Sequence, residues 1–266
     1  MSLTPWKEAS LETLSQIDGI CFDIDDTFST DGKILPETYQ SLWSLKASGF
    51  QLVAVTGRPA GWCDHIARFW PVDAVVGENG AFTFFMNQGK RERLDTPQVL
   101  SLEEMRKKLN QLKIDLLYQW KDLSFASDQP YREYDLAIDF CEDVPPWTSD
   151  EVQKLVKFCE SKGAIAKVSS IHVNTWFGSF EKSKGFEYWL EQTQKEEKRS
   201  KERWLYIGDS PNDEPMFNVF QWSVAVSNIQ PFLKQIKKYP QWITQEYSGK
   251  GFVEMSERMI LSRGEK

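Results

Sequence analysis

Short apolar runs alternate with amphipathic segments through the first third of the chain. Within one amphipathic segment, Tyr39, Leu42 and Leu45 recur every third residue, the spacing of a helix face, and Gly49 marks its end. The predicted elements are strands at 17–24, 51–56 and 74–76 and helices at 36–48 and 61–69. This strand–helix alternation predicts a parallel sheet, because parallel neighbours need crossover connections.

The last third repeats the same order of elements. Its predicted strands lie at 204–207, 223–226 and 242–244, and its predicted helices at 214–220, from 231 onward and at the C-terminus. The two thirds therefore predict two halves of one α/β domain.

The middle of the chain has a different rhythm. Asn87-Gln88-Gly89 separates two strand-like runs, which predicts a hairpin and hence antiparallel pairing. Further predicted elements are helices at 101–112 and 149–161 and strands at 134–140, 164–168 and 171–176. We therefore predict an α/β core formed by residues 1–83 and 179–266, with an α+β insert at 84–178.

Composition excludes several classes of protein. The 266 residues contain 32 Lys+Arg and 39 Asp+Glu, which gives a net charge of −7. A chain of this charge lacks the positive electrostatic field that binding to nucleic acid requires. No run approaches a membrane span of about 18 apolar residues, and the first residues do not resemble a secretory signal. We expect a cytoplasmic protein without nucleic-acid or membrane partners. Nothing in the sequence predicts an oligomeric state.

The four cysteines are expected to be free thiols. Cys21, Cys63, Cys141 and Cys159 lie far apart and form no C-x-x-C pair, so the sequence encodes neither a zinc knuckle nor a redox motif.

An acidic turn follows the first predicted strand. Asp23 and Asp25 of the string Asp-Ile-Asp-Asp-Thr alternate along an extended chain, so both can face one divalent ion and one phosphoryl group. A calcium loop is excluded because Phe28 occupies the position that needs glycine. A helix cap or Asx-turn remains the structural alternative for this turn taken alone.

Three further polar segments accompany this turn. Thr56-Gly57-Arg58 follows the second strand, where a hydroxyl and an amide can hold a phosphoryl oxygen. Lys182 and Lys184 lie at the start of a predicted helix, where a lysine opposes the helix dipole unless an anion holds it; the residues alone do not choose between them. A second acidic turn, Gly208 to Asp213, follows a strand, and its carboxylates suit Mg²⁺.

These four segments, in this order, resemble the haloacid dehalogenase-like hydrolase superfamily, in its Cof-type sugar-phosphatase branch with a large α/β cap after the second motif. The resemblance covers nearly the whole chain and implies a Rossmann-like parallel-sheet core with helices on both faces and a cap that selects the substrate. Most members carry Gly where this chain has Asp26.

The resemblance also implies roles for individual residues. Asp23 would be the nucleophile that forms an aspartyl phosphate, Asp25 the acid/base, Thr56 the phosphoryl-binding hydroxyl and Lys184 of Ser-Lys-Gly the lysine that neutralises charge. The implied cofactor is Mg²⁺, bound by Asp23, Asp25 through its carbonyl, Asp209 and Asp213, the last directly or through water. The predicted substrate contacts are Thr56, Gly57, Arg58, Asn79, His172, Asn174, Lys184 and Asn212.

The expected activity is Mg²⁺-dependent hydrolysis of a small phosphorylated metabolite, a sugar phosphate by preference. The presence of Asp25 two residues after the nucleophile resembles phosphatases and phosphomutases rather than transport ATPases or dehalogenases. A sugar phosphomutase and a non-catalytic phosphometabolite sensor remain alternatives. The alternative for His172 and Asn174 is a half-exposed strand with ordinary polar residues. Tryptophans of the cap could stack on a sugar ring, but packing is the favoured interpretation for them.

Overall fold

The computed structural model describes residues 3–97, 99–194 and 200–264. In these ranges the strands of the larger sheet have the spatial order β1-β12-β11-β10-β2-β3-β4-β5-β6. Their bounds are β1 Thr4–Pro5, β2 Gly19–Phe22, β3 Gln51–Val55, β4 Ala74–Gly77, β5 Phe82–Asn87, β6 Lys90–Asp95, β10 Trp204–Gly208, β11 Trp222–Ala225 and β12 Trp242–Ile243. All neighbours from β1 to β4 pair in parallel, as predicted.

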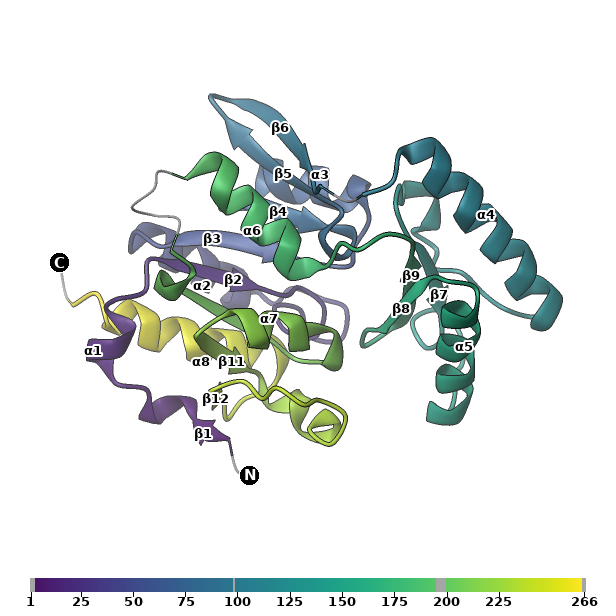
Figure 1. The fold of residues 1–266 in the computed structure, drawn as a ribbon. Coiled ribbons are helices and arrows are strands. Elements are labelled where there is room, and N and C mark those ends of the chain that lie inside the picture. Colours follow the sequence, from purple (N-terminus) through teal and green to yellow (C-terminus); the bar gives the residue numbers. More distant parts are fainter. Residues whose placement is uncertain (1–2, 98, 195–199, 265–266) are drawn as a thin grey trace.

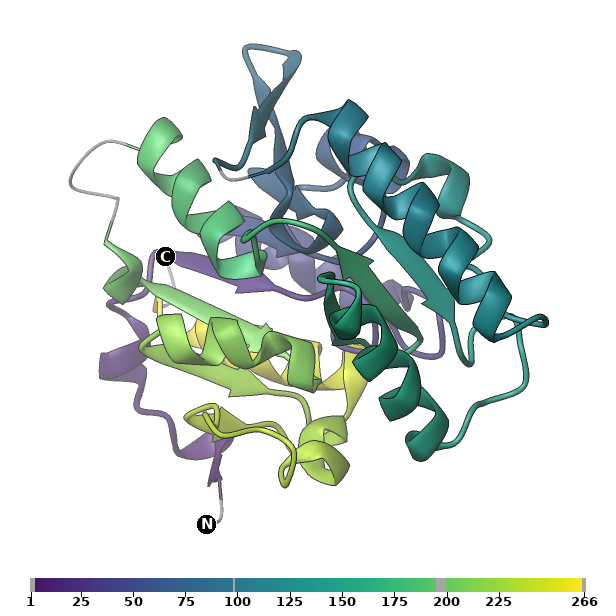
Figure 2. The same cartoon turned by 45° about the vertical axis from the view of Figure 1, so that its right-hand side comes forward.

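Helices cover both faces of this sheet (Figures 1 and 2). One face carries α2 (Pro36–Ala47), α3 (Ala60–Phe69) and α8 (Ser248–Leu261), and the other α6 (Lys182–Thr193) and α7 (Glu214–Val219); α1 (Leu11–Leu14) packs beside α8. Successive residues of β3 alternate between the two cores: Leu52 packs toward α2 and α8, whereas Val53 packs toward α6. The two-sided burial explains why the central strands are continuous apolar runs.

The insert forms a separate small sheet. It has the order β7-β9-β8, all antiparallel, with β7 Leu136–Asp139, β8 Ile165–Val168 and β9 His172–Trp176. Two helices, α4 (Leu102–Gln119) and α5 (Ser149–Ser161), cover its outer face, and each begins at a Ser or Thr capping box. The opposite face of this sheet lies over the carboxyl ends of the core strands (Figure 2).

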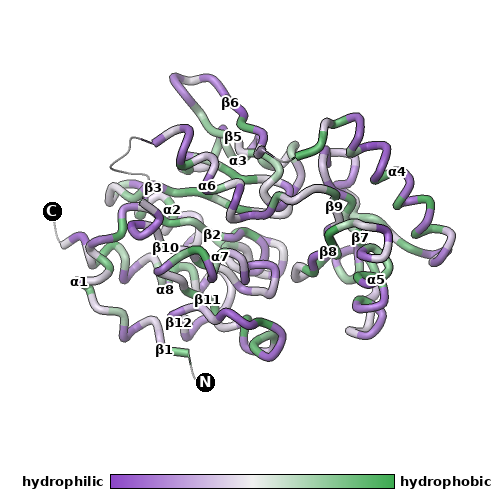
Figure 3. Tube along the Cα trace, in the orientation of Figure 1, coloured by the Kyte–Doolittle hydropathy of each residue, from purple (hydrophilic) through white to green (hydrophobic). Residues whose placement is uncertain are grey.

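The predicted hairpin forms, but it belongs to the core. β5 pairs antiparallel with β4, so β5 and β6 extend the large sheet rather than start the cap. The insert therefore begins after Asp95, not at residue 84. The edge strand β6 is rich in charged residues, which protects an open edge from pairing, and the hairpin tip is hydrophilic in Figure 3.

One predicted helix is absent from the described residues. The segment from 231 onward does not form an α-helix; Ser227–Phe232 instead forms a 3-10 turn that contains Pro231. Other 3-10 turns cover Trp6–Glu8, Glu78–Gly80, Gln129–Tyr131, Lys201–Arg203 and Pro211–Asp213. Among the described helices, none combines the length and apolarity needed to cross a bilayer.

Candidate active site

Three neighbouring core strands end beside one another under the cap. β2 lies between β3 and β10 in the sheet, and all three are parallel. Asp23 follows β2, Thr56 follows β3 and Asp209 follows β10. Because parallel strands end at one edge of a sheet, segments far apart in the sequence meet there.

The buried carboxylate of Asp23 contacts a buried lysine. Lys182, the first residue of α6, donates from Nζ to Asp23 Oδ1 at 2.6 Å and to Asp213 Oδ1 at 2.8 Å. Burial, together with Asp213 and Asp25, raises the pKa of Asp23 to about 8 although Lys182 opposes this shift. Burial alone would lower the pKa of Lys182, but Asp213 and Asp23 raise it above its usual value, so Lys182 is a cation.

Lys184 lies outside this cluster. Its side chain is exposed and donates from Nζ to the carbonyl of Ser179 at 2.6 Å. At 3.6 residues per turn, two positions along a helix rotate a side chain by about 200°, onto the opposite face. The prediction that Lys184 reaches the site is therefore wrong, and Lys182 occupies that place.

The carboxylates of Asp23, Asp209 and Asp213 form a group that could hold a metal ion. One oxygen from each lies within 4.8 Å of the others. Burial and the neighbouring carboxylates of Asp213 and Asp23 raise the pKa of Asp209 well above its usual value. Within the described parts of the chain, Lys182 is the cation hydrogen-bonded to this group. Hard oxygen donors with excess negative charge fit Mg²⁺.

Asp213 has hydrogen-bond partners at both oxygens. Oδ1 accepts from Lys182 Nζ at 2.8 Å and from the Tyr206 hydroxyl at 2.6 Å. Oδ2 accepts from the backbone N–H groups of Asp209 at 3.0 Å and Ser210 at 3.3 Å. Asp213 thus joins the lysine to the loop after β10.

The neighbouring Asp26 adopts a conformation that glycine reaches more easily. Its φ of 56° lies in the left-handed region. Its N–H donates to Ser29 Oγ at 3.1 Å, and its carbonyl accepts from Asn228 Nδ2 at 2.9 Å. These bonds hold the turn in place, so an aspartate is accommodated there.

The loop after β3 presents Thr56 and Gly57. Thr56 is buried, and its Oγ1 accepts from the N–H of Arg58 at 3.0 Å. Because the oxygen accepts this bond, the hydroxyl hydrogen can donate to a phosphoryl oxygen. The carbonyl of Gly57 accepts from Nη1 of Arg132 in the cap at 2.7 Å, and this bond holds the loop against the cap.

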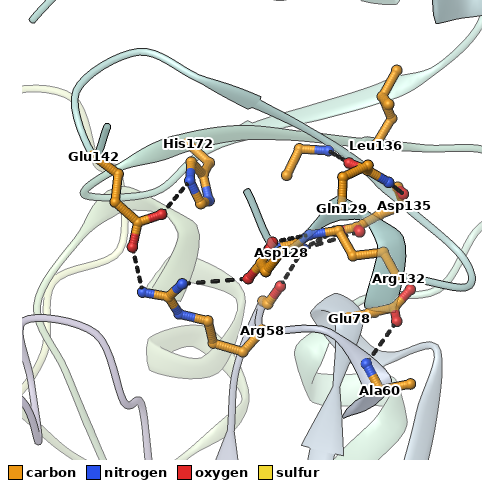
Figure 4. Close-up of polar contacts among 12 residues, drawn as sticks. Arg58, Ala60, Glu78, Asp128, Gln129, Arg132, Asp135, Leu136, Glu142 and His172 are labelled. Carbon is orange, nitrogen blue, oxygen red and sulfur yellow. Dashed lines mark hydrogen bonds and ion pairs between the residues drawn. The ribbon is translucent and has the colours of Figure 1, made fainter. Parts of the chain in front are cut away.

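Arg58 bridges core and cap (Figure 4). Its Nε lies 3.1 and 3.0 Å from the two oxygens of Asp25, and its Nη2 lies 2.8 Å from Oδ1. The same guanidinium donates to Glu142 Oε1 at 2.9 Å and Asp128 Oδ2 at 3.4 Å, both in the cap. Burial opposes ionisation, but Asp25 and Glu142 hold the pKa of Arg58 above its usual value.

His172, on β9, contacts the carboxylate of Glu142, which also accepts from Arg58. Its Nε2 lies 2.8 Å from Oε2 of Glu142. The hydrogen bond from His172, together with Arg58, lowers the pKa of Glu142 to about 2 although burial opposes this shift. His172, a predicted substrate contact, therefore lies at the site, where its Nε2 contacts Glu142.

Asn174 and Asn79 have different surroundings. Asn174 is 3% exposed, and among the described residues its Oδ1 has no hydrogen-bond partner. A Cβ on Gly57 would lie 2.7 Å from its Nδ2, so cap and core touch at this point. Asn79 Nδ2 instead donates to Asp135 Oδ2 of the cap at 3.3 Å, which makes it a domain contact.

A second buried carboxylate joins the two domains away from the metal group. Glu78 accepts from the N–H groups of Ala60 at 3.0 Å, Glu133 at 2.9 Å and Tyr134 at 2.5 Å. Ala60 begins α3, whereas Glu133 and Tyr134 belong to the insert. Glu78 therefore holds together the start of a core helix and the cap segment that precedes β7.

The cap closes tightly over the site. The enclosed space at the junction measures about 20 Å³, room for about one water molecule. Predicted residues that line it are Asp23, Asp25, Gly57, Arg58, His172, Asn174 and Asn212. Cap and core therefore leave little free volume between them at this point.

A larger groove adjoins this space. It measures about 810 Å³ and shares Ser169, Ser170, Ser210 and Asn212 with the enclosed cavity. Its walls include Trp147 and other aromatic and aliphatic side chains next to hydroxyl and amide groups; Lys167 and Glu214 are its charged members.

Several site residues have no strong signal in the sequence. The residues alone leave Lys182 and Lys184 as alternatives for the lysine of the site, and only the register of α6 distinguishes them. Tyr206 lies within an apolar strand, and this pattern predicts an ordinary core residue. Arg132 and Glu142 lie in loops of the insert and belong to no recognisable motif.

Comparison with known proteins agrees with this geometry. A family model described as haloacid dehalogenase-like hydrolase matches residues 20–135 and 149–255, so the chain belongs to this family. The predicted family and fold class are confirmed. No curated protein matches the sequence significantly.

Solved structures share the fold at low sequence identity. A Thermoplasma acidophilum protein superposes with a TM-score of 0.69 at 20% identity, covering 92% of this chain and 99% of its own. The C-terminal domain of Candida albicans trehalose-6-phosphate phosphatase gives 0.68 at 12% identity, covering 94% of each chain. A Bacteroides thetaiotaomicron phosphatase of the superfamily gives 0.63 at 15%, covering 92% of this chain and 96% of its own.

Proposed function

We propose that this hydrolase is a Mg²⁺-dependent phosphatase of a small phosphorylated metabolite, acting through an aspartyl phosphate. The observation that carries the proposal is the contact of the buried Lys182 with Asp23, beside Asp209 and Asp25. A phosphate ester repels a carboxylate nucleophile unless positive charge is present. Mg²⁺ bound by Asp23, Asp209 and the carbonyl of Asp25 would supply part of that charge, as a Lewis acid on the phosphoryl oxygens.

In the first step an oxygen of Asp23 attacks phosphorus in line with the ester bond. The new bond joins Asp23 to phosphorus, the ester P–O bond breaks, and Asp25 gives its proton to the leaving alcohol. Lys182 and the hydroxyl of Thr56 hold the phosphoryl oxygens. Lys182 replaces Lys184 in this role because it is the lysine that contacts Asp23.

In the second step water attacks the phosphorus of the aspartyl phosphate. Asp25 takes the proton from this water, the bond between phosphorus and Asp23 breaks, and inorganic phosphate leaves. Both steps require Asp25 to exchange a proton, so Arg58 must release its carboxylate when the cap opens and substrate enters.

We propose a sugar phosphate as the substrate class. The groove beside the site combines the indole of Trp147 with hydroxyl and amide groups, which suits a neutral polyhydroxylated alcohol with apolar ring faces. His172, Asn174 and Asn212 would contact the alcohol near the ester, and the unpartnered Oδ1 of Asn174 can accept from one of its hydroxyls.

The test is a phosphate-release assay against a panel of phosphate monoesters, with and without Mg²⁺, for the wild type and Asp23→Asn. We expect Mg²⁺-dependent release in the wild type alone. Acid-quenched wild type incubated with substrate labelled at phosphorus should retain label on the protein, and Asp23→Asn should not. Isomerisation of a sugar phosphate without release would instead identify a mutase, and tight binding without either reaction a sensor.

A further inference from the structure

Tyr206 lies beneath the acidic group. It is fully buried on β10, and its ring packs against Phe217 and Phe220, with ring centroids 5.7 and 5.6 Å apart. Its hydroxyl donates to Oδ1 of Asp213 at 2.6 Å. The packed ring gives this hydroxyl a fixed position, which a solvent-exposed side chain would lack.

The bond from Tyr206 completes the set of donors around Asp213. An ionised carboxylate has about four acceptor positions, and Lys182, Tyr206 and two backbone N–H groups occupy them here. The site is built for this close approach: a Cβ on Gly208 would lie 2.4 Å from Oδ2 of Asp213. Asp209, by contrast, accepts a side-chain hydrogen bond from Thr27 alone among the described residues.

We infer that Tyr206 is a positioning residue: its hydroxyl keeps Asp213 bound to Lys182 and prevents it from binding the metal. The carboxylates that would bind the metal are then those of Asp23 and Asp209. This inference rests on the proposed function. Asp213, predicted as a metal ligand, is then a partner of the lysine. The division matters because Lys182 must stay beside Asp23 while the same carboxylate would also hold the metal.

Loss of the hydroxyl should have two effects. Asp213 Oδ1 gains a free acceptor position within 4.8 Å of the other carboxylates, so the substrate-free protein should bind Mg²⁺ about fivefold more tightly. Lys182 loses its fixed partner, and since a small misplacement costs rate, kcat should fall about tenfold. KM should change less than twofold, because the lysine acts on charge that develops in the transition state.

The experiment compares Tyr206→Phe with Tyr134→Phe. Tyr134 is also buried, and its hydroxyl donates to a carboxylate, Asp95 at 3.4 Å, outside the site. Calorimetric titration of each substrate-free protein with Mg²⁺ gives the dissociation constant, steady-state assays give kcat and KM, and circular dichroism checks folding. An Mg²⁺ dissociation constant for Tyr206→Phe equal to that of Tyr134→Phe overturns the inference.

A second pair of variants tests the same division if Tyr206→Phe does not fold. Asp209→Asn should weaken Mg²⁺ binding by more than about a hundredfold, whereas Asp213→Asn should weaken it by less than about tenfold. Equal losses in the two variants overturn the inference. These titrations need no turnover, so a wild type without phosphatase activity would refute the proposed function and still leave the role of Tyr206 measurable.

Discussion

The guanidinium of Arg58 engages both carboxylate oxygens of Asp25, with Nη2 2.8 Å from Oδ1. An acid catalyst must place its carboxyl group against the oxygen of the leaving alcohol, and both carboxylate oxygens of Asp25 face the guanidinium here. In this closed arrangement Arg58 therefore occupies the proposed acid/base, and the proposed reaction requires Arg58 to leave it. The same side chain also contacts two cap carboxylates, so we expect its release to accompany cap opening.

Arg58→Met should destabilise the protein by about 3 kcal/mol, because it leaves buried and half-buried carboxylates without their cation. Urea unfolding measures this change. Arg93→Met is the matched control, since Arg93 also joins core and cap, through Glu133, but is 25% exposed; its loss should cost about 1 kcal/mol or less. Equal losses of unfolding free energy in both variants would contradict the conclusion that the buried Arg58 contributes more to stability than the more exposed Arg93.

Lys182→Met should reduce kcat/KM by at least about a thousandfold, since it removes the buried cation beside the nucleophile. Lys184→Met should stay within twofold of the wild type, because Lys184 contacts only the Ser179 carbonyl among the described residues. Phosphate release under identical conditions compares the two. Comparable losses would show that both lysines act in the reaction.

Chelation of Mg²⁺ should lower the melting temperature of the wild type. A ligand at a hundredfold its dissociation constant stabilises the folded state by about 2.7 kcal/mol. Asp209→Asn should show no Mg²⁺-dependent shift, and in chelator it should melt above the wild type, because it relieves repulsion from Asp23 and Asp213. Differential scanning calorimetry with and without chelator tests both statements. If Mg²⁺ raised the melting temperature of Asp209→Asn as much as that of the wild type, the metal site that includes Asp209 would be refuted.

Acid should release the contacts made by Glu142. Its pKa falls from an ordinary 4.5 to about 2 in the folded protein, through the hydrogen bond from His172 first and Arg58 next. A lowered pKa contributes stability above pH 4.5, which is lost as the pH falls from about 4.5 toward 2. Melting temperatures across this range should therefore fall less steeply in Glu142→Gln than in the wild type. Glu133→Gln, which removes the cap carboxylate paired with Arg93, should keep the steeper wild-type profile.

Gly57→Ala should push the cap away from the core. Its Cβ would lie 2.7 Å from Asn174 Nδ2 and 3.2 Å from Asn79 Oδ1, so we expect a loss of about 1–3 kcal/mol in unfolding free energy and a higher KM. Truncation of the opposing side chain in Gly57→Ala/Asn174→Ala should recover part of that stability. Strictly additive losses in the double variant would indicate that the two residues do not touch.

The local sequence predicted most elements and the nature of the site. The buried strands are apolar runs because both faces of the core sheet are covered, and this pattern is visible in residues such as Leu52 and Val53. Asp23 and Asp209 follow strands directly and Asp25 lies two residues further on, so parallel pairing alone is enough to bring them to one edge. The hairpin of β5 and β6 was also predictable from its turn, although not its place in the core sheet.

Only the tertiary structure decided which side chains meet. Lys182 and Lys184 have the same chemistry, and the register of α6 against the sheet determines which one is buried beside Asp23. The pairing of Arg58 with Glu142 depends on how the cap packs on the loop after β3, and that of Tyr206 with Asp213 on how the turn after β10 folds back on its strand. Residue type and spacing therefore predicted which kinds of side chain gather at the candidate site, whereas packing decided which of them contact one another, because such contacts leave no periodic pattern in the chain.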